Sequence, residues 1–107
     1  MSYKIKTPEE VQVMIAKKDV NFIDVRTPQE RAYDGYIAGS SLIDIRSPDF
    51  DQELGALDKN ETLILYCHAG NRSKTAAQKA IDAGFKDVCM IEGGIAEWES
   101  CGLPVEK

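Results

Sequence analysis

The stretch Thr62–Cys67, with the sequence TLILYC, constrains the fold of this chain more than any other segment. Polar side chains do not alternate with its apolar ones, so we expect a strand that is buried on both faces. Such strands are typical of parallel sheets, in which the connecting helices cover both faces. We therefore expect this segment to be the most buried strand of a parallel sheet.

The rest of the chain alternates between candidate strands and candidate helices on short connections. Further strands are predicted over 20–25, 41–45 and 87–91. Helices are predicted after the capping boxes Thr7-Pro8-Glu9-Glu10 and Thr27-Pro28-Gln29-Glu30, from about 47 to 57, from about 73 to 83, and over 95–100. This order predicts one α/β domain over residues 1–107, a central parallel sheet with helices on both faces.

Charge and composition exclude several classes of partner. The 13 basic and 18 acidic residues give a net charge of −5, which disfavours binding to nucleic acid or to an anionic membrane. No apolar run is long enough to span a membrane, and the N-terminal residues lack the apolar stretch of a signal peptide, so a cytoplasmic location is expected. Three cysteines without a C-x-x-C pair, and one histidine, predict neither disulfides nor a metal site.

Cys67 stands where the buried strand should end and a helix should soon begin. Ligands of open α/β sheets bind at this edge, and the free N–H groups of a helix N-terminus stabilise a thiolate. The small residues Ala69 and Gly70 let the backbone curl into an anion-binding loop. Arg72 is expected either to point into this loop or to brace it, and Ser73 to be the helix N-cap. We expect Cys67 to be an exposed nucleophile.

Three motifs carry a resemblance to a known family. CHAGNRS, from Cys67 to Ser73, is similar to the C-x-x-G-x-R-S active-site loop of the rhodanese sulfurtransferases. FIDVRTPQE, Phe22–Glu30, resembles the family's D-V-R-x-x-x-E segment, and EGGIAEW, Glu92–Trp98, its G-G-x-x-x-W ending. The motifs keep the family's order and spacing, so the chain resembles a single rhodanese domain along nearly its whole length.

The resemblance implies sulfur transfer in two steps. Cys67 would take a sulfane sulfur from thiosulfate or a similar donor and become a persulfide, and cyanide, a small thiol or a protein acceptor would remove it. The donor and the persulfide would be bound by the loop residues His68, Ala69, Gly70, Asn71, Arg72 and Ser73. No cofactor is implied. His68 stands where thiosulfate-using members often carry a second basic residue, which leaves the physiological donor open.

Two other classes of function remain open. Cysteine-dependent phosphatases and arsenate reductases also combine a cysteine, an anion-binding loop and an arginine, but with five residues between the two. Here four residues separate Cys67 from Arg72. The second alternative is a non-catalytic rhodanese-like module that binds a partner or relays redox state.

Five residues outside the loop are given structural roles. Cys89, inside the predicted strand 87–91, is expected in the core, and Cys101 at the surface. Asp24 and Arg26 are expected to pair near the site, and Trp98 to anchor the last helix.

Overall fold

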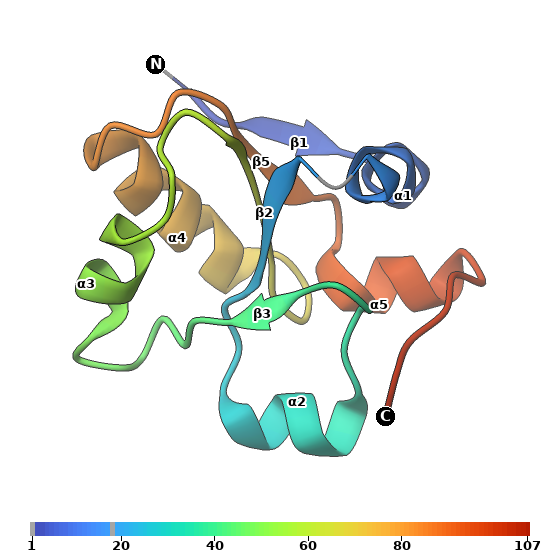
Figure 1. The fold of residues 1–107 in the computed structure, drawn as a ribbon. Helices are drawn as coiled ribbons and strands as arrows, with labels where there is room; N and C mark the ends of the chain where they lie inside the picture. The colour runs from blue at the N-terminus through green and yellow to red at the C-terminus, as the bar shows by residue number, and fades with distance from the viewer. Residues whose placement is uncertain (1, 18) are drawn as a thin grey trace.

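A computed structural model describes residues 2–17 and 19–107. Within this part of the chain, five strands form one sheet in the order β1-β5-β4-β2-β3 (Figure 1). All strand pairs are parallel, as predicted. The strands are β1 (Lys4–Lys6), β2 (Val20–Asp24), β3 (Ser41–Leu42), β4 (Thr62–Tyr66) and β5 (Val88–Ile91). The apolar strand β4 lies in the middle of this order, which confirms the prediction made from its sequence.

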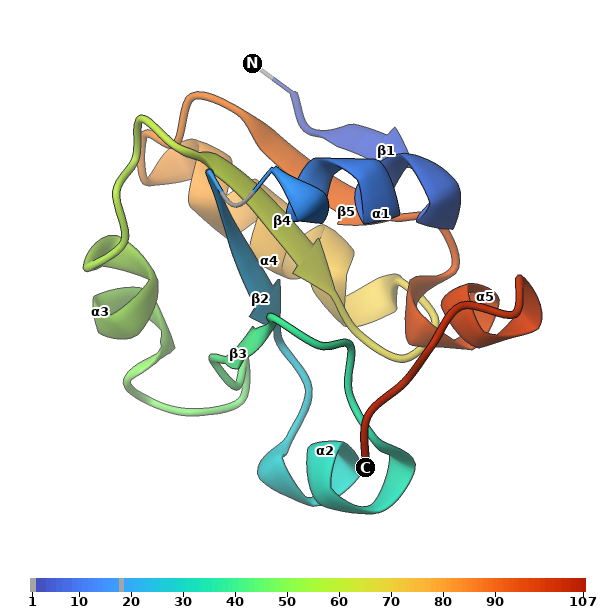
Figure 2. The ribbon, with the colours of Figure 1, turned by 45° about the vertical axis from the view of Figure 1, so that its right-hand side comes forward.

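Helices cover both faces of the sheet. They are α1 (Pro8–Ala16), α2 (Pro28–Asp34), α3 (Phe50–Gly55), α4 (Asn71–Asp82) and α5 (Gly94–Ser100). In Figures 1 and 2, α3 and α4 lie on one side of the sheet and α1 and α5 on the other. The short helix α2 lies beyond the end of β2, outside both layers, and buries none of its residues fully.

Alternate residues of β4 pack into two separate hydrophobic cores, one on each face of the sheet. Leu63 and Leu65 pack with the alanines of α4 on one face of the sheet. Ile64 and Tyr66 pack with Val11 of α1 and with α5 on the other. These four side chains are fully buried, and each such residue contributes roughly 1.5–3 kcal/mol relative to an exposed one.

Both predicted capping boxes are present. In α1, the Thr7 hydroxyl accepts from the N–H of Glu10, and the Glu10 carboxylate accepts from the N–H of Thr7. Thr27 and Glu30 repeat this arrangement at the start of α2. Each box satisfies two free N–H groups at a helix start.

Three predictions for residues outside the loop are also confirmed. Trp98 is buried, and its indole N–H donates to the carbonyl of Pro104 at 2.9 Å, which anchors α5. Cys89 lies in the core beside Ile64, and Cys101 is exposed.

One strand was not predicted, and the bounds of α3 and β3 differ from the predictions. Strand β1 was not expected, because its three residues offer a single apolar side chain, Ile5. Helix α3 begins at Phe50 rather than near residue 47, because Ser47 starts a turn in which its carbonyl accepts from the N–H of Phe50. Strand β3 ends at Leu42, three residues before the predicted end.

No helix in the described part of the chain is both long enough and apolar enough to cross a membrane.

Candidate active site

Cys67 follows the last residue of β4, at the carboxyl end of the central strand. A short loop connects it to α4, which begins at Asn71. The loop turns at Gly70, whose φ of 111° lies in the left-handed region that favours glycine. The predicted junction of a strand, a cysteine and a helix is therefore present.

The loop directs backbone donors at the sulfur. The N–H of Gly70 donates to the Cys67 Sγ at 3.1 Å, and the N–H of Ser73 donates to it at 3.4 Å. Both donors belong to the N-terminal turn of α4, where no intrahelical carbonyl is available to them. The geometry suits a sulfur that carries negative charge.

Ser73 is not the N-cap that the sequence predicts. Helix α4 begins two residues earlier, with Gly70 as its N-cap, so Ser73 is the third residue of the helix. Its hydroxyl donates to the carbonyl of Gly70 at 3.0 Å and lies 3.5 Å from the Cys67 Sγ. The side chain thus holds the turn closed and adds a hydroxyl beside the sulfur.

Cys67 is buried, with 1% of its surface exposed, which contradicts the expectation of an exposed nucleophile. The loop folds over the sulfur, and α5 packs against the backbone of Cys67 and His68. The carbonyls of these two residues accept from the N–H groups of Ile95 at 2.9 Å and Ala96 at 3.0 Å. The side chains of His68, Ala69 and Asn71 are exposed.

Gly94 makes this contact with α5 possible, a role that the sequence did not reveal. A Cβ atom at Gly94 would lie 2.6 Å from the carbonyl oxygen of Cys67 and 2.5 Å from that of His68. These distances are far below van der Waals contact. The second glycine of EGGIAEW is therefore needed where α5 meets the cysteine loop.

Arg72 braces the loop rather than pointing into it. Its Nη1 and Nη2 donate to the Glu30 Oε1 and Oε2 at 2.5 and 2.7 Å. This hydrogen-bonded pair lowers the pKa of Glu30 to about 2 and raises the pKa of Arg72. The sequence indicated Glu30 as a capping residue and as the last residue of the D-V-R-x-x-x-E segment, but not that its carboxylate connects α2 to the loop.

Asp24 and Arg26 form the predicted pair at the end of β2. The Arg26 Nε and Nη2 donate to the two carboxylate oxygens of Asp24 at 2.9 and 2.8 Å, and both side chains are fully buried. Arg26 Nη2 also donates to the carbonyl of Gly35 at 2.6 Å. The pair therefore ties the end of α2 to the sheet.

The other two thiols lie in less favourable surroundings for a nucleophile. Burial raises the pKa of Cys89, and Asp87 adds to this effect. Desolvation and the carboxylates of Glu9 and Glu97 raise the pKa of Cys101. No three His, Cys, Asp or Glu side chains among residues 2–17 and 19–107 gather in the way that a metal site needs.

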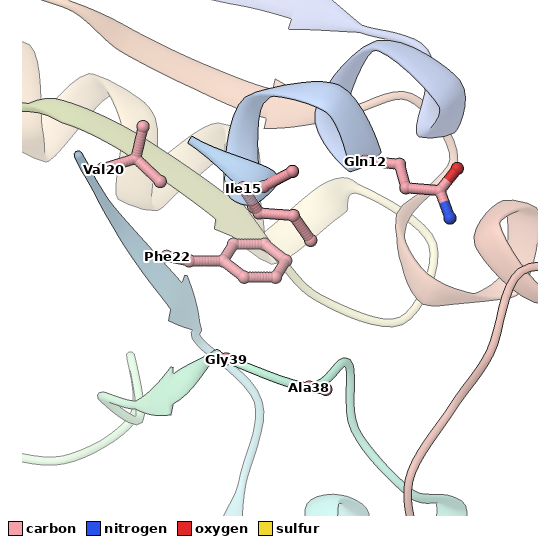
Figure 3. A pocket seen from close by; sticks show the side chains of 7 residues that line it. Gln12, Ile15, Val20, Phe22, Ala38 and Gly39 are labelled. Carbon is pink, nitrogen blue, oxygen red and sulfur yellow. The ribbon is translucent and has the colours of Figure 1, made fainter. Parts of the chain in front are cut away.

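A small cleft of about 210 Å³ borders the loop. It is lined by Ala69, Gly70, Asn71 and Lys74 on one side and by Ile5, Met90, Glu92 and Gly93 on the other. A larger cavity of about 520 Å³ lies between α1 and β2, where Ile15 and Phe22 form an apolar lining (Figure 3). None of its lining residues is titratable or belongs to the loop, so the larger cavity is not the chemical site.

Comparison with known proteins agrees with this geometry. Residues 7–101 match the family described as the rhodanese-like domain. The chain belongs to the rhodanese family. This rhodanese is 37% identical over 94 residues to the thiosulfate sulfurtransferase GlpE of Pseudomonas aeruginosa, covering 87% of this chain and 81% of that protein. The resemblance that the three motifs carry is thereby confirmed.

Two further relatives widen the comparison. The rhodanese is 33% identical over 102 residues to the dual specificity phosphatase Cdc25 of Arabidopsis thaliana, covering 83% of this chain and 68% of that protein. A rhodanese-related protein from Thermoplasma volcanium superposes with a TM-score of 0.83 at 29% identity, over 96% of this chain and 97% of that one.

Proposed function

We propose that this rhodanese is a sulfurtransferase that carries one sulfane sulfur on Cys67 as a persulfide. The observation that carries the proposal is the pair of backbone N–H groups, from Gly70 and Ser73, that donate to the Cys67 Sγ. Preorganised donors of this kind stabilise negative charge without reorganisation during the reaction. Membership of the family and similarity to GlpE support the same activity.

In the first step, the Cys67 thiolate attacks the outer sulfur of thiosulfate or a similar donor. A bond forms between Sγ and that sulfur, the S–S bond of thiosulfate breaks, and sulfite leaves with the electron pair. The product is the Cys67 persulfide anion. The loop residues His68 to Ser73 would surround its terminal sulfur, and the N–H groups of Gly70 and Ser73 would hold its charge.

In the second step, an acceptor attacks the outer sulfur of the persulfide. Cyanide leaves as thiocyanate, and a thiolate, whether small or on a protein, becomes a persulfide itself. The Cys67 thiolate is the leaving group, so the enzyme returns to its starting state. Covalent catalysis by one cysteine suffices for both steps, without a cofactor or metal.

Phosphoester hydrolysis is the second candidate function, and the similarity to the Cdc25 phosphatase favours it. Against it stands the size of the loop, which has four residues between Cys67 and Arg72. This ring brings the N–H groups of Gly70 and Ser73 within 3.1 and 3.4 Å of a single sulfur atom. A tetrahedral phosphate needs more room. The presence of both Cys67 and Arg72 argues against a non-catalytic module.

Mass spectrometry of the intact protein tests the proposal. Treatment with thiosulfate should add the mass of one sulfur atom, peptide mapping should locate it on Cys67, and cyanide should remove it as thiocyanate. The Cys67→Ser variant should take up no sulfur, while the Cys101→Ser variant, which changes an exposed thiol, should behave as wild type. Full transfer activity in the Cys67→Ser variant would refute the assignment.

A further inference from the structure

The two capping boxes of this chain are alike in sequence but differ in what their glutamates contact. Glu10 accepts from the N–H of Thr7 at 2.9 Å and is exposed. Glu30 accepts from the N–H of Thr27 at 3.2 Å and also receives both terminal nitrogens of Arg72. Only the second glutamate therefore reaches the cysteine loop.

This contact neutralises the arginine of the loop. Both terminal nitrogens of Arg72 are used by one carboxylate, in the geometry that an incoming sulfonate or sulfate would otherwise occupy. The side chains of Arg72 and Glu30 are 25% and 27% exposed, so an anion in solution can compete for the guanidinium. Arg72 directly precedes Ser73, whose N–H donates to the Cys67 Sγ at 3.4 Å, so the same helical turn carries the guanidinium and holds the sulfur. The hydrogen-bonded Glu30 is the main cause of the raised pKa of Arg72.

We propose that Glu30 determines which donors this site accepts, by opposing donors of high negative charge. A dianionic donor such as thiosulfate must displace the Glu30 carboxylate from Arg72 or approach both charges together. A donor with a single negative charge, such as an alkyl persulfide anion, meets a smaller barrier. Glu30 is thus a specificity-determining residue that acts through Arg72. The inference rests on the proposed function and narrows its donors to sulfane sulfur compounds of low charge.

A comparison of two sulfur donors of different charge distinguishes this role of Glu30 from a purely structural one. Thiosulfate carries two negative charges and releases sulfite, whereas the methanethiosulfonate anion carries one and releases methanesulfinate. In both reactions the Cys67 thiolate bonds to the terminal sulfur, and the S–S bond of the donor breaks with its electron pair on the departing group. Because Coulomb energy is linear in charge, a change at Glu30 should act twice as strongly, on a logarithmic scale, on the dianion.

The Glu30→Gln variant tests the inference, with Glu10→Gln as the matched control. Glutamine preserves a capping box, so helix starts are kept in both variants. For Glu30→Gln we expect KM to fall about tenfold for thiosulfate and about threefold for methanethiosulfonate at low salt, with a smaller fall at high salt. Glu10→Gln should leave both values unchanged. In the double variant Glu30→Gln/Arg72→Ala, KM for thiosulfate should no longer fall below the wild-type value.

The inference would be overturned if Glu30→Gln left KM for thiosulfate unchanged, raised it, or changed it equally for both donors. Binding of sulfate, a dianion without sulfane sulfur, gives a second measurement that does not depend on activity. Stabilisation by a ligand reports its affinity, so the sulfate-dependent rise in Tm should be larger for Glu30→Gln than for wild type or Glu10→Gln. If sulfur transfer is absent but this rise is present, the proposed function fails while the charge selection by Glu30 stands. If the rise is absent, the inference fails.

Discussion

Glu30 and Arg72 form a two-point ion pair between helix α2 and the cysteine loop, across 42 positions of the sequence. Helix α2 buries no residue fully, so polar contacts hold it to the sheet, including those of Arg31 with Asp24 and Ser40. Arg26 contacts the carbonyl of Gly35 at one end of the helix, and Glu30 holds Arg72 near the other. The position of α2 is therefore connected to the shape of the loop around Cys67.

The ion pair predicts how stability depends on pH. The pKa of Glu30 falls from an ordinary 4.5 to about 2 in the folded state. The folded protein then binds fewer protons than the unfolded one, so the stabilisation is complete above about pH 5 and is lost as the pH falls toward 2. Because the pair is partly exposed, we expect about 1 kcal/mol at neutral pH.

Urea unfolding of wild type and Glu30→Gln at a series of pH values measures this contribution. The two free energies of unfolding should differ by about 1 kcal/mol at pH 7 and converge as the pH falls toward 2. The Arg72→Ala variant, which removes the partner, should show the same convergence. A difference that stays constant down to pH 2 would mean that the carboxylate charge does not stabilise the fold.

Substitution of Gly94 by alanine should disrupt the cysteine loop. The added Cβ would lie 2.6 Å from the carbonyl oxygen of Cys67, and the backbone of α5 cannot move away without breaking the bond from the N–H of Ile95. We expect a loss of at least about 3 kcal/mol in the free energy of unfolding, together with loss of sulfur transfer.

Gly84→Ala is the matched control for this clash. Gly84 also has a positive φ, of 97°, but a Cβ there would meet nothing within 4 Å. Its substitution should therefore cost only the strain of the left-handed backbone, about 1 kcal/mol, and leave sulfur transfer intact. If urea unfolding showed the same loss in the free energy of unfolding for Gly94→Ala and Gly84→Ala, the close approach of Gly94 to the loop would be unimportant.

The hydroxyl of Ser73 gives a third prediction. It bonds to the carbonyl of Gly70 at 3.0 Å and lies 3.5 Å from the Cys67 Sγ. The hydroxyl accepts from the Cys67 thiol in this structure and can turn from the Gly70 carbonyl to donate to the thiolate once the thiol ionises. Ser73→Ala should therefore lower kcat/KM for sulfur transfer about tenfold, because a hydrogen bond to a charged group contributes about 1.5 kcal/mol. Thr75→Ala, on the exposed side of the same helix, is the control and should transfer sulfur as wild type does. Steady-state rates that match for both variants would contradict this role.

The fold followed closely from local patterns in the sequence. The apolar run of β4 and the two capping boxes act over a few residues, so their structures could be predicted from those residues alone. The pair of Asp24 and Arg26 is also local, since the two are separated by one residue. Strand β1 could not be predicted, because its identity depends on pairing with β5.

The site was harder to predict because its details depend on distant contacts. The burial of Cys67 and the need for glycine at position 94 both arise where α5 packs on the loop. The pairing of Arg72 with Glu30 depends on where α2 lies relative to α4. Ser73 resembled an N-cap by type and position, but the left-handed Gly70 lets the helix start two residues earlier. Motif spacing located the site without revealing these contacts.

The size of the loop gives the last prediction, which distinguishes sulfur transfer from phosphoester hydrolysis. With four residues between Cys67 and Arg72, the N–H groups of Gly70 and Ser73 converge on one sulfur atom. Insertion of one glycine after Asn71 should widen this ring, weaken the bond from the N–H of Ser73 and lower sulfur transfer at least about tenfold, as expected when one preorganised donor is lost. Rates with thiosulfate and with p-nitrophenyl phosphate, measured on both proteins, give the comparison. Wild type should hydrolyse the phosphate ester far more slowly than it transfers sulfur. The insertion should lower the ratio of the rate of sulfur transfer to the rate of ester hydrolysis. Faster turnover of the ester than of thiosulfate by wild type would make the phosphatase function the better assignment.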